Sequence, residues 1–474
     1  MSELSRPAFH FTPPSMWLND PNGLVYLDGE YHLFYQYHPH STVWGPMHWG
    51  HAISRDLIHW EHLPIALYPD EFGMVFSGSA VVDVQNTAGF GKNALVAIFT
   101  YNKDYRETQN LAYSTDRGRT WTKYADNPVI PAPDPLGDCR DPKVFWHEDH
   151  WVLLLAAKDK VLFFSSPNLK DWQLTGEFGN GFGSTEGVWE TPDLFLLPVN
   201  ASDSRWVLTV GLGKGSHAGG SGTQYFVGEF NGKTFTSENP KETVLWMDYG
   251  ADFYAPQSWS NEPHGRRIML AWMSNWQYAL FTPTEPWRGQ FSLPRELSLV
   301  QTVGGIRLRQ QPPAETSSLR GKNFHWQNVD AVPAENLLRE IHGSTFEIDV
   351  KFQLAETTQV FGFRVRKGSE NHTTIGFDAR SNEIFIDRTQ SGMIDFYEGF
   401  AARHTVKMKS PAARMHIFAD RSSVEVFVND GIVCLSDLIY PSPESLDLEI
   451  FTEGGTVHLM SLDVYQLENH KAVL

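Results

Sequence analysis

The chain has 474 residues, of which 41% are hydrophobic and 13% aromatic, and it carries a formal net charge of −18 at pH 7. This composition supports a globular core, while the acidic balance disfavours nucleic acid or an anionic membrane surface as a partner. The two cysteines, Cys139 and Cys434, are too few for a disulfide framework or a thiolate zinc site, and no apolar run approaches the ~20 residues of a transmembrane helix.

The start of the chain, Met-Ser-Glu-Leu-Ser-Arg-Pro, lacks the basic-then-apolar pattern of a secretion signal. We therefore expect a cytoplasmic protein, or a secreted one if a leader has been removed. Short apolar runs separated by Gly, Asn, Asp and Pro then predict β-strands, as at residues 31–37. Residues 151–156 are apolar on both faces and predict a buried central strand.

A degenerate repeat indicates how these strands are grouped. Residues 54–60 (Ser-Arg-Asp-Leu-Ile-His-Trp) recur in altered form at 114–121 and 166–172, with a weaker copy at 230–235. The first three copies start 60 (114 − 54) and 52 (166 − 114) residues apart. Repeats of this length made of short strands are typical of propeller blades, and about 300 residues allow five. The alternative is a set of ordinary β-turns that share Ser, Asp and Trp.

The pattern changes after a segment of linker composition at residues 312–323. Residues 346–352 alternate apolar and charged side chains, which predicts a strand with one wet face. Residues 424–428 lead into the turn Asn429-Asp430-Gly431, and such spacing favours an antiparallel sandwich. We therefore predict an all-β chain with three parts: a five-bladed β-propeller catalytic domain at residues 1–310, a linker at 311–322 and a C-terminal β-sandwich at 323–474.

Three acidic residues lie in aromatic, turn-rich contexts. Asp20 lies in Trp-Leu-Asn-Asp-Pro-Asn-Gly (17–23), Asp141 in Arg-Asp-Pro (140–142), and Glu190 in Trp-Glu-Thr-Pro-Asp (189–193). Taken singly, they fit a surface turn, a local ion pair and a strand-end acid. Together they predict a sugar-cleaving pocket, because hydrolysis of a glycosidic bond needs paired carboxyl groups.

The immediate neighbours of these acids lead to two further expectations. The Arg140 guanidinium should keep Asp141 ionised, and the Trp189 indole should partly desolvate Glu190, as suits a general acid. Seven histidines crowd residues 32–62 without a compact ligand spacing, so no metal site is expected. There is no Gly-rich phosphate loop and no Gly-x-Ser-x-Gly elbow, and no cofactor is expected.

These motifs resemble those of glycoside hydrolase family 32, which contains invertases, inulinases and levanases. The resemblance extends to residues 34–37, 49–52, 76–79, 252–255, 272–278 and 286–288. It implies a five-bladed propeller with a C-terminal sandwich and a retaining double displacement. In that scheme Asp20 is the nucleophile, Glu190 the acid/base and Asp141 the acid that stabilises the transition state. Thr191 stands where the family has Cys.

The resemblance also implies a substrate and the residues around it. The predicted activity is that of a β-fructofuranosidase, which releases terminal β-D-fructofuranosyl units from sucrose, fructo-oligosaccharides or fructans. A retaining pair places the carboxyls of Asp20 and Glu190 about 5–5.5 Å apart. The residues implied to bind substrate are Asn19, Gln36, Trp44, Phe76, Ser77, Arg140, Tyr254, Trp276 and Trp287.

Three other functions stay open from the sequence. A fructosyltransferase shares the same acids and differs in its acceptor. An arabinan-cleaving propeller enzyme inverts configuration, with carboxyls about 6.5–9.5 Å apart. A non-catalytic fructan-binding protein would not need all three acids. A sugar is the only partner that the motifs imply, and a homodimer through the sandwich is an open alternative.

Overall fold

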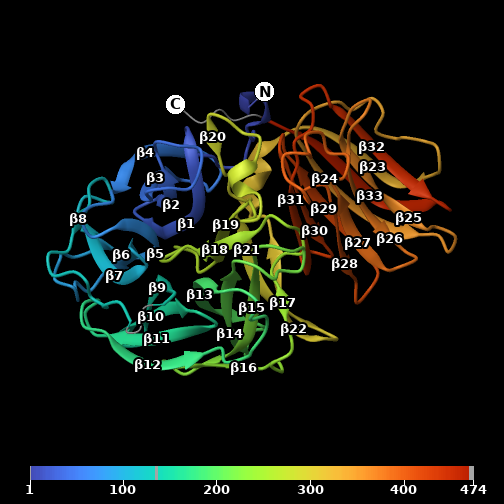
Figure 1. Ribbon diagram of the computed structural model, residues 1–474. Helices are drawn as coiled ribbons and strands as arrows, with labels where there is room; N and C mark the ends of the chain where they lie inside the picture. Colours follow the sequence, from blue (N-terminus) through green and yellow to red (C-terminus); the bar gives the residue numbers. More distant parts are fainter. Residues whose placement is uncertain (1, 134–136, 469–474) are drawn as a thin grey trace.

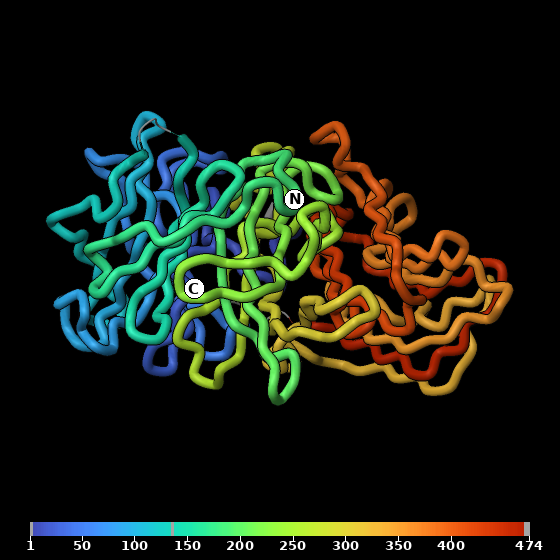
Figure 2. The backbone as a smooth tube through the Cα atoms, turned by 90° about the horizontal axis from the view of Figure 1, so that it is seen from below, coloured from blue at the N-terminus to red at the C-terminus, as the bar shows by residue number. Residues whose placement is uncertain are grey.

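The computed structural model describes residues 2–133 and 137–468 and shows an all-β chain, with a propeller beside a sandwich (Figure 1). In the described residues, five sheets surround a central axis and two more stack against each other. Figure 2 shows the propeller, in blue to yellow, passing into the sandwich, in orange to red. No helix among these residues is long and apolar enough to span a membrane.

Each blade is an antiparallel sheet whose first strand lies nearest the axis. Blade 1 has β1 (Met16–Leu27), β2 (Glu30–His38), β3 (His48–Ser54) and β4 (Trp60–Leu67). Blade 2 has β5 (Met74–Asp83), β6 (Ala94–Lys103), β7 (Arg106–Ser114) and β8 (Thr122–Lys123). Blade 3 has β9 (Cys139–His147), β10 (His150–Ala157), β11 (Lys160–Ser166) and β12 (Gln173–Phe178).

The last two blades carry additions. Blade 4 has β13 (Trp189–Pro198), β14 (Ser204–Leu212), β15 (Gly222–Phe230), β16 (Phe235–Ser237) and β17 (Leu245–Trp246). Blade 5 has β18 (Tyr254–Ser258), β19 (Arg267–Trp272), β21 (Arg295–Thr302) and β22 (Gly305–Gln311). Between β19 and β21 lie the 3-10 turn η2 (Ala279–Phe281) and β20 (Trp287–Arg288), which pairs in parallel with β1. Backbone hydrogen bonds from Ser260 to Leu24 and from Tyr26 to Ser260 also join blades 5 and 1, so the ring is closed.

The repeated Ser-Asp-Trp segments are one structural unit. They join the third and fourth strands of blades 1 to 3, and the fourth copy joins β15 to β16. In the first three, the serine hydroxyl donates to the oxygen of the Asp or Asn two residues later. The tryptophan indole donates to the carbonyl three residues earlier, over 3.1 Å for Trp60 and Trp121 and 2.8 Å for Trp172. Each turn thus satisfies its own polar groups and sets the start of the outermost strand.

The C-terminal domain is a sandwich of a six-stranded and a five-stranded sheet in the described chain. The first contains β23 (Arg320–Ala331), β33 (Val457–Leu467), β24 (Phe346–Leu354), β29 (Arg414–Ala419), β30 (Ser423–Val428) and β31 (Val433–Leu438). The second contains β28 (Arg403–Lys407), β27 (Glu383–Asp387), β26 (Thr373–Asp378), β25 (Val360–Lys367) and β32 (Asp447–Glu453). Ile348, Phe363, Ile417 and Val464 belong to the apolar core between the sheets.

Strand β24 differs from the expected strand with one wet face. Glu347, on its outward face, is buried, because Arg320 donates two hydrogen bonds of 2.7 Å to its carboxylate and His416 a third. The side chains of Arg320, at the start of β23, and of His416, on the neighbouring strand β29, therefore cover the part of this face that alternation in the sequence marks as exposed.

The two domains join through a short connection and a polar interface. β22 ends at Gln311, the 3-10 turn η3 spans Ala314–Leu319, and β23 starts at Arg320. The N-terminal segment, which begins with the 3-10 turn η1 (Ser2–Ser5), runs along this junction. There His10 contacts Asp420 at 2.8 Å and Glu425 at 2.9 Å, and Arg295 of the propeller contacts Glu425 at 2.7 Å.

Candidate active site

The innermost strand of every blade is interrupted by a bulge. In β1, β5, β9, β13 and β18 the pairing with the second strand shifts so that two residues face one. The two residues that face one partner residue are 19–20 in β1, 76–77 in β5, 141–142 in β9, 191–192 in β13 and 255–256 in β18. Bulges re-aim the side chains beside them, so each blade can turn one or two residues toward the axis.

The residues that end these bulges fit their position. Pro142, Pro192 and Pro256 lie inside the bulge, Pro21 directly after it, and Gly78 takes the equivalent place in β5. Proline lacks an N–H and is tolerated at sheet edges, where the innermost strands lie. A Cβ on Gly78 would lie 2.1 Å from the Ile98 carbonyl oxygen, so β6 approaches too closely there for any side chain.

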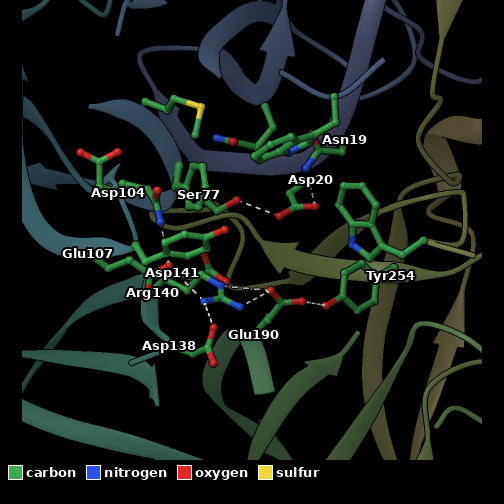
Figure 3. A pocket seen from close by; sticks show the side chains of 17 residues that line it. Asn19, Asp20, Ser77, Asp104, Glu107, Asp138, Arg140, Asp141, Glu190 and Tyr254 are labelled. Atoms are coloured by element: carbon green, nitrogen blue, oxygen red, sulfur yellow. Dashed lines mark hydrogen bonds and ion pairs between the residues drawn. The ribbon is translucent and has the colours of Figure 1, made fainter. Parts of the chain in front are cut away.

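The side chains at the bulges meet in one cavity of about 560 Å³ (Figure 3). Three acids from three blades line it: Asp20, Asp141 and Glu190. The further residues around it that the sequence singles out are Asn19, Gln36, Trp44, Phe76, Ser77, Arg140, Tyr254 and Trp276. Those that the sequence analysis missed are Met74, Asn102, Asp104, Tyr105, Glu107 and Asp138.

Asp20 is buried at the inner end of the cavity and held on both oxygens. The Asn19 amide donates to Oδ1 over 3.0 Å, and the Ser77 hydroxyl of blade 2 donates to Oδ2 over 2.8 Å. The Trp17 indole in turn fixes Asn19 through a 2.7 Å hydrogen bond. Burial, assisted by the charge of Glu190, raises the pKa of Asp20 to about 6 despite these donors.

Asp141 is buried beside the two other acids, and its Oδ2 accepts the Thr191 backbone N–H over 2.9 Å. Burial raises the pKa of Asp141 well above its ordinary value, with further contributions from Glu190 and Asp20. Arg140 opposes this shift without cancelling it. The pKa of Asp141 therefore shifts in the direction opposite to the one that the neighbouring arginine alone would cause.

The guanidinium of Arg140 instead holds Glu190. Its Nε and Nη2 donate to Oε1 over 3.0 and 2.9 Å, and the Tyr254 hydroxyl donates to Oε2 (Figure 3). The Glu190 side chain stays 21% exposed, facing the cavity. Trp189 points away, because consecutive strand residues face opposite sides, and its indole donates to the Ser184 carbonyl in the core of blade 4. The expected desolvation of Glu190 by Trp189 is therefore wrong.

Arg140 is itself held by two acids that the sequence analysis did not single out. Its Nη1 donates to Glu107 over 3.1 Å and to Asp138 over 2.7 Å. Glu107 also accepts the Cys139 backbone N–H over 2.7 Å, which ties the start of β9 to blade 2. Glu107 lies in a strand without a recognisable motif, so the sequence carried no signal for it.

The side chain of Thr191 faces away from any polar partner. Its backbone N–H serves Asp141, while its hydroxyl is buried without a hydrogen-bond partner within residues 2–133 and 137–468. The effect of this residue on the site therefore comes from its backbone, which adopts a left-handed φ of 47° in the bulge.

Trp276 and Trp287 have different surroundings. Trp276 lines the cavity and stacks on Trp17, with ring centroids 6.0 Å apart. Trp287 is buried in β20 beneath the Arg6 guanidinium, and it is absent from the cavity wall formed by the described residues. The pairing of β20 with the start of β1 places it behind the wall. Within the described chain no group of three or more His, Cys, Asp or Glu is placed to hold a metal ion.

Two family profiles match the chain along nearly its whole length. They are the "Glycosyl hydrolases family 32 N-terminal domain" at residues 10–312 and the "Glycosyl hydrolases family 32 C terminal" at residues 315–466. A levanase of Bacillus subtilis (strain 168) is 50% identical over 98% of this chain and 70% of its own length. A levanase of Bacillus sp. (strain L7) is 43% identical over 99% of this chain, which spans only 53% of that protein.

A solved structure shares the complete architecture. The crystal structure of an exo-inulinase from Aspergillus awamori superposes with a TM-score of 0.92 at 38% identity, and the match covers 98% of both chains. The order of propeller and sandwich is therefore common to the two proteins.

Proposed function

Because the chain belongs to glycoside hydrolase family 32, we propose that it is a retaining β-fructofuranosidase that works on the ends of its substrates. It hydrolyses terminal fructosyl units of fructans and sucrose, in line with its levanase and exo-inulinase relatives. The observation that carries the proposal is the convergence of three acids from blades 1, 3 and 4 on one cavity of about 560 Å³.

The surroundings of each acid support the role that we propose for it. Asp20, held on both oxygens by Asn19 and Ser77, attacks the anomeric carbon and forms the fructosyl-enzyme. Glu190 lies across from it, protonates the leaving oxygen and then takes a proton from the incoming water. Asp141 accepts hydrogen bonds from fructosyl hydroxyls, which strengthen as positive charge develops on the ring.

Arg140 and Tyr254 orient the proton donor. They reach opposite oxygens of Glu190, so the carboxyl plane is fixed relative to the attacking Asp20. Trp44, Phe76 and Trp276 supply the apolar walls that pack against a sugar face and exclude water.

Replacement of the two acids tests the assignment. Asp20→Asn and Glu190→Gln should each lower kcat on sucrose by at least about 10³-fold, because each removes a group that reacts. Asp149→Asn and Glu340→Gln are matched controls, because both acids have strongly exposed side chains outside the cavity. Activity within tenfold of the parent in either acid variant would refute the proposal.

Azide rescue separates the two roles. With Glu190→Ala, azide can replace water in the second step and should give a fructosyl azide of retained configuration. With Asp20→Ala, azide can only attack directly and should give the inverted product. Identical configurations from both variants would exclude a covalent fructosyl-enzyme on Asp20.

A further inference from the structure

The wall of the cavity on the side of blade 2 continues outward to two hairpin tips with exposed aromatic side chains. Tyr105 lies in the turn between β6 and β7 and is 86% exposed. Phe72 lies in the turn before β5 and is 64% exposed. These two residues are called the aromatic ledge below. Both side chains are mostly exposed, so most of their apolar surface is not buried in the core.

Tyr105 occupies a backbone conformation that suits another residue. Lys103 pairs with Arg106, so the hairpin has a two-residue loop, Asp104-Tyr105, with φ values of 52° and 63°. Two-residue loops with positive φ at both positions favour Asn or Asp followed by Gly. A bulky residue there is strained. The aromatic residue at position 105 therefore makes the turn less stable than glycine would, and burial of its ring does not offset this strain.

Tyr105 connects the ledge to the catalytic cavity. Asn102, Asp104 and Tyr105 line the same space as Asp20 and Glu190, and Figure 3 draws Asp104 at the opposite edge of the pocket from Tyr254. A terminal fructosyl unit bound between the acids would leave the rest of its chain pointing out of the mouth, past these tips.

The two tips form one supported surface. Lys103 Nζ donates to the Glu71 carbonyl over 2.7 Å, and the Phe72 ring lies 6.3 Å from that of Tyr101. Asp70 begins the outer turn and accepts the Tyr101 hydroxyl over 2.6 Å, so this tip is anchored to β6. The aromatic side chains are therefore presented from fixed positions.

We propose that the aromatic ledge binds the fructosyl units that follow the one being cleaved, and thereby favours fructan chains over sucrose. This inference rests on the proposed function and adds the part of the substrate outside the cavity. Aromatic faces pack against the C–H faces of sugars, and a neutral polysaccharide is not repelled by the acidic residues nearby, such as Asp104 and Glu71. Sucrose has a single glucosyl unit beyond the cleaved bond, whereas a fructan chain continues past it.

The test compares kcat/KM on sucrose, on fructo-oligosaccharides of increasing length and on levan and inulin. Tyr105→Gly and Phe72→Ala should each lower kcat/KM on the polymers by about threefold to tenfold, the effect of one lost aromatic contact, and the loss on the polymers should exceed the loss on sucrose. The loss should appear only above a threshold oligosaccharide length. Tyr105→Phe keeps the ring and should behave like the parent. Leu174→Ala, at an exposed position on β12, is the apolar control.

Thermal unfolding separates binding from folding, because glycine fits this loop better than tyrosine. Tyr105→Gly should unfold at the same or a higher temperature than the parent while it loses polymer activity. Equal losses on sucrose and polymer, no loss on either, or a loss in Tyr105→Phe as large as in Tyr105→Gly would overturn the inference. A change of oligomeric state in Phe72→Ala without a change in polymer kinetics would instead assign the ledge to a second copy of the chain. If the parent protein released no fructose from any substrate, the proposed function would fall, and the inference with it.

Discussion

At the scale of single residues, the orientation of the Glu190 carboxyl depends in part on the hydroxyl of Tyr254, which can be removed without changing Glu190 itself. Tyr254→Phe deletes the hydroxyl that donates to Oε2 and keeps the ring. A hydrogen bond to a carboxylate is worth about 1.5–3 kcal/mol, so kcat on sucrose should fall roughly 10- to 100-fold. Steady-state kinetics measure this, with Tyr113→Phe on the outer side of blade 2 as the control. A fall of less than threefold would show that Arg140 alone orients the acid.

The second residue-scale prediction concerns pH. Burial raises the pKa of Asp20 to about 6, and only the ionised carboxylate can attack. The rate constant kcat/KM, which reports the free enzyme, should therefore rise with pH through about 6 and fall about tenfold for each pH unit below it. Measuring kcat/KM on sucrose from about pH 4 to pH 7 checks this. A rate that stays flat down to about pH 4 would mean that Asp20 is not the group that attacks.

The sequence identified the three acids of the cavity but not their partners. Asp20, Asp141 and Glu190 stand out because each has a proline or aromatic residue beside it, a local signal. The partner of Glu190 is neither of its neighbours but Arg140, which comes from another blade. Glu107 was missed for the same reason, since a contact across blades leaves no trace in the local sequence.

At the scale of elements, the same distinction separates the turns from the bulges. The Ser-Asp-Trp turns could be predicted because their hydrogen bonds join residues two to four positions apart. The bulges depend on pairing with the next strand, so no short motif announces them. A periodic signal was nevertheless present: Pro21, Gly78, Pro142, Pro192 and Pro256 follow one another at intervals of 57, 64, 50 and 64 residues.

The bulge in β5 can be tested with one methyl group. Gly78→Ala would place a Cβ 2.1 Å from the Ile98 carbonyl oxygen and 2.7 Å from the Phe99 Cα, so β5 must move away from β6. The free energy of unfolding should fall by roughly 1–3 kcal/mol. kcat should also fall, because Ser77 precedes this residue and donates to Asp20.

Denaturant unfolding and kinetics on sucrose measure the two effects of Gly78→Ala. Gly304→Ala is the control, because its nearest neighbour is the flexible end of Lys409. Unchanged stability together with unchanged kcat would show that β5 tolerates a side chain at the bulge.

At the scale of the whole molecule, a charged cluster holds the N-terminal segment, the propeller and the sandwich together. Asp420 accepts the backbone N–H groups of Ala8, Phe9 and His10, and Glu425 accepts that of Leu293 and the Arg295 guanidinium. Burial alone would lower the pKa of His10, but its hydrogen bonds to Asp420 and Glu425 raise it to about 9.

This cluster predicts how stability depends on pH. The folded pKa of His10 lies above its unfolded value, so its contribution is complete below about pH 6.5 and is lost as the pH rises through about 9. The raised pKa of His10 corresponds to a contribution of roughly 3 kcal/mol to the free energy of unfolding. The midpoint of unfolding should therefore decrease as the pH rises from about 6.5 to about 9. In His10→Gln the midpoint should depend less on pH over this range. His325→Gln, an exposed histidine paired with Asp463, is the control. An equal slope in the parent and His10→Gln would contradict the prediction.

The architecture was the most predictable level, because repeat length and alternating polarity are spread over many residues. The family match and the exo-inulinase structure agree with the propeller and sandwich read from those patterns. The prediction of a solvent-exposed face on β24 was wrong at Glu347, because the alternation of residue types does not show that Arg320 and His416 cover this side chain.

The bulges in the innermost strands, where two residues face one, limit how the protein can be engineered. Removing one of the two residues from such a bulge would restore regular pairing while the later residues keep their partners, so the change would fall on the side chains at the bulge, among them Asp20, Ser77 and Asp141. Libraries aimed at new sugar specificities should therefore vary amino-acid identity at these positions and keep the length of each strand constant.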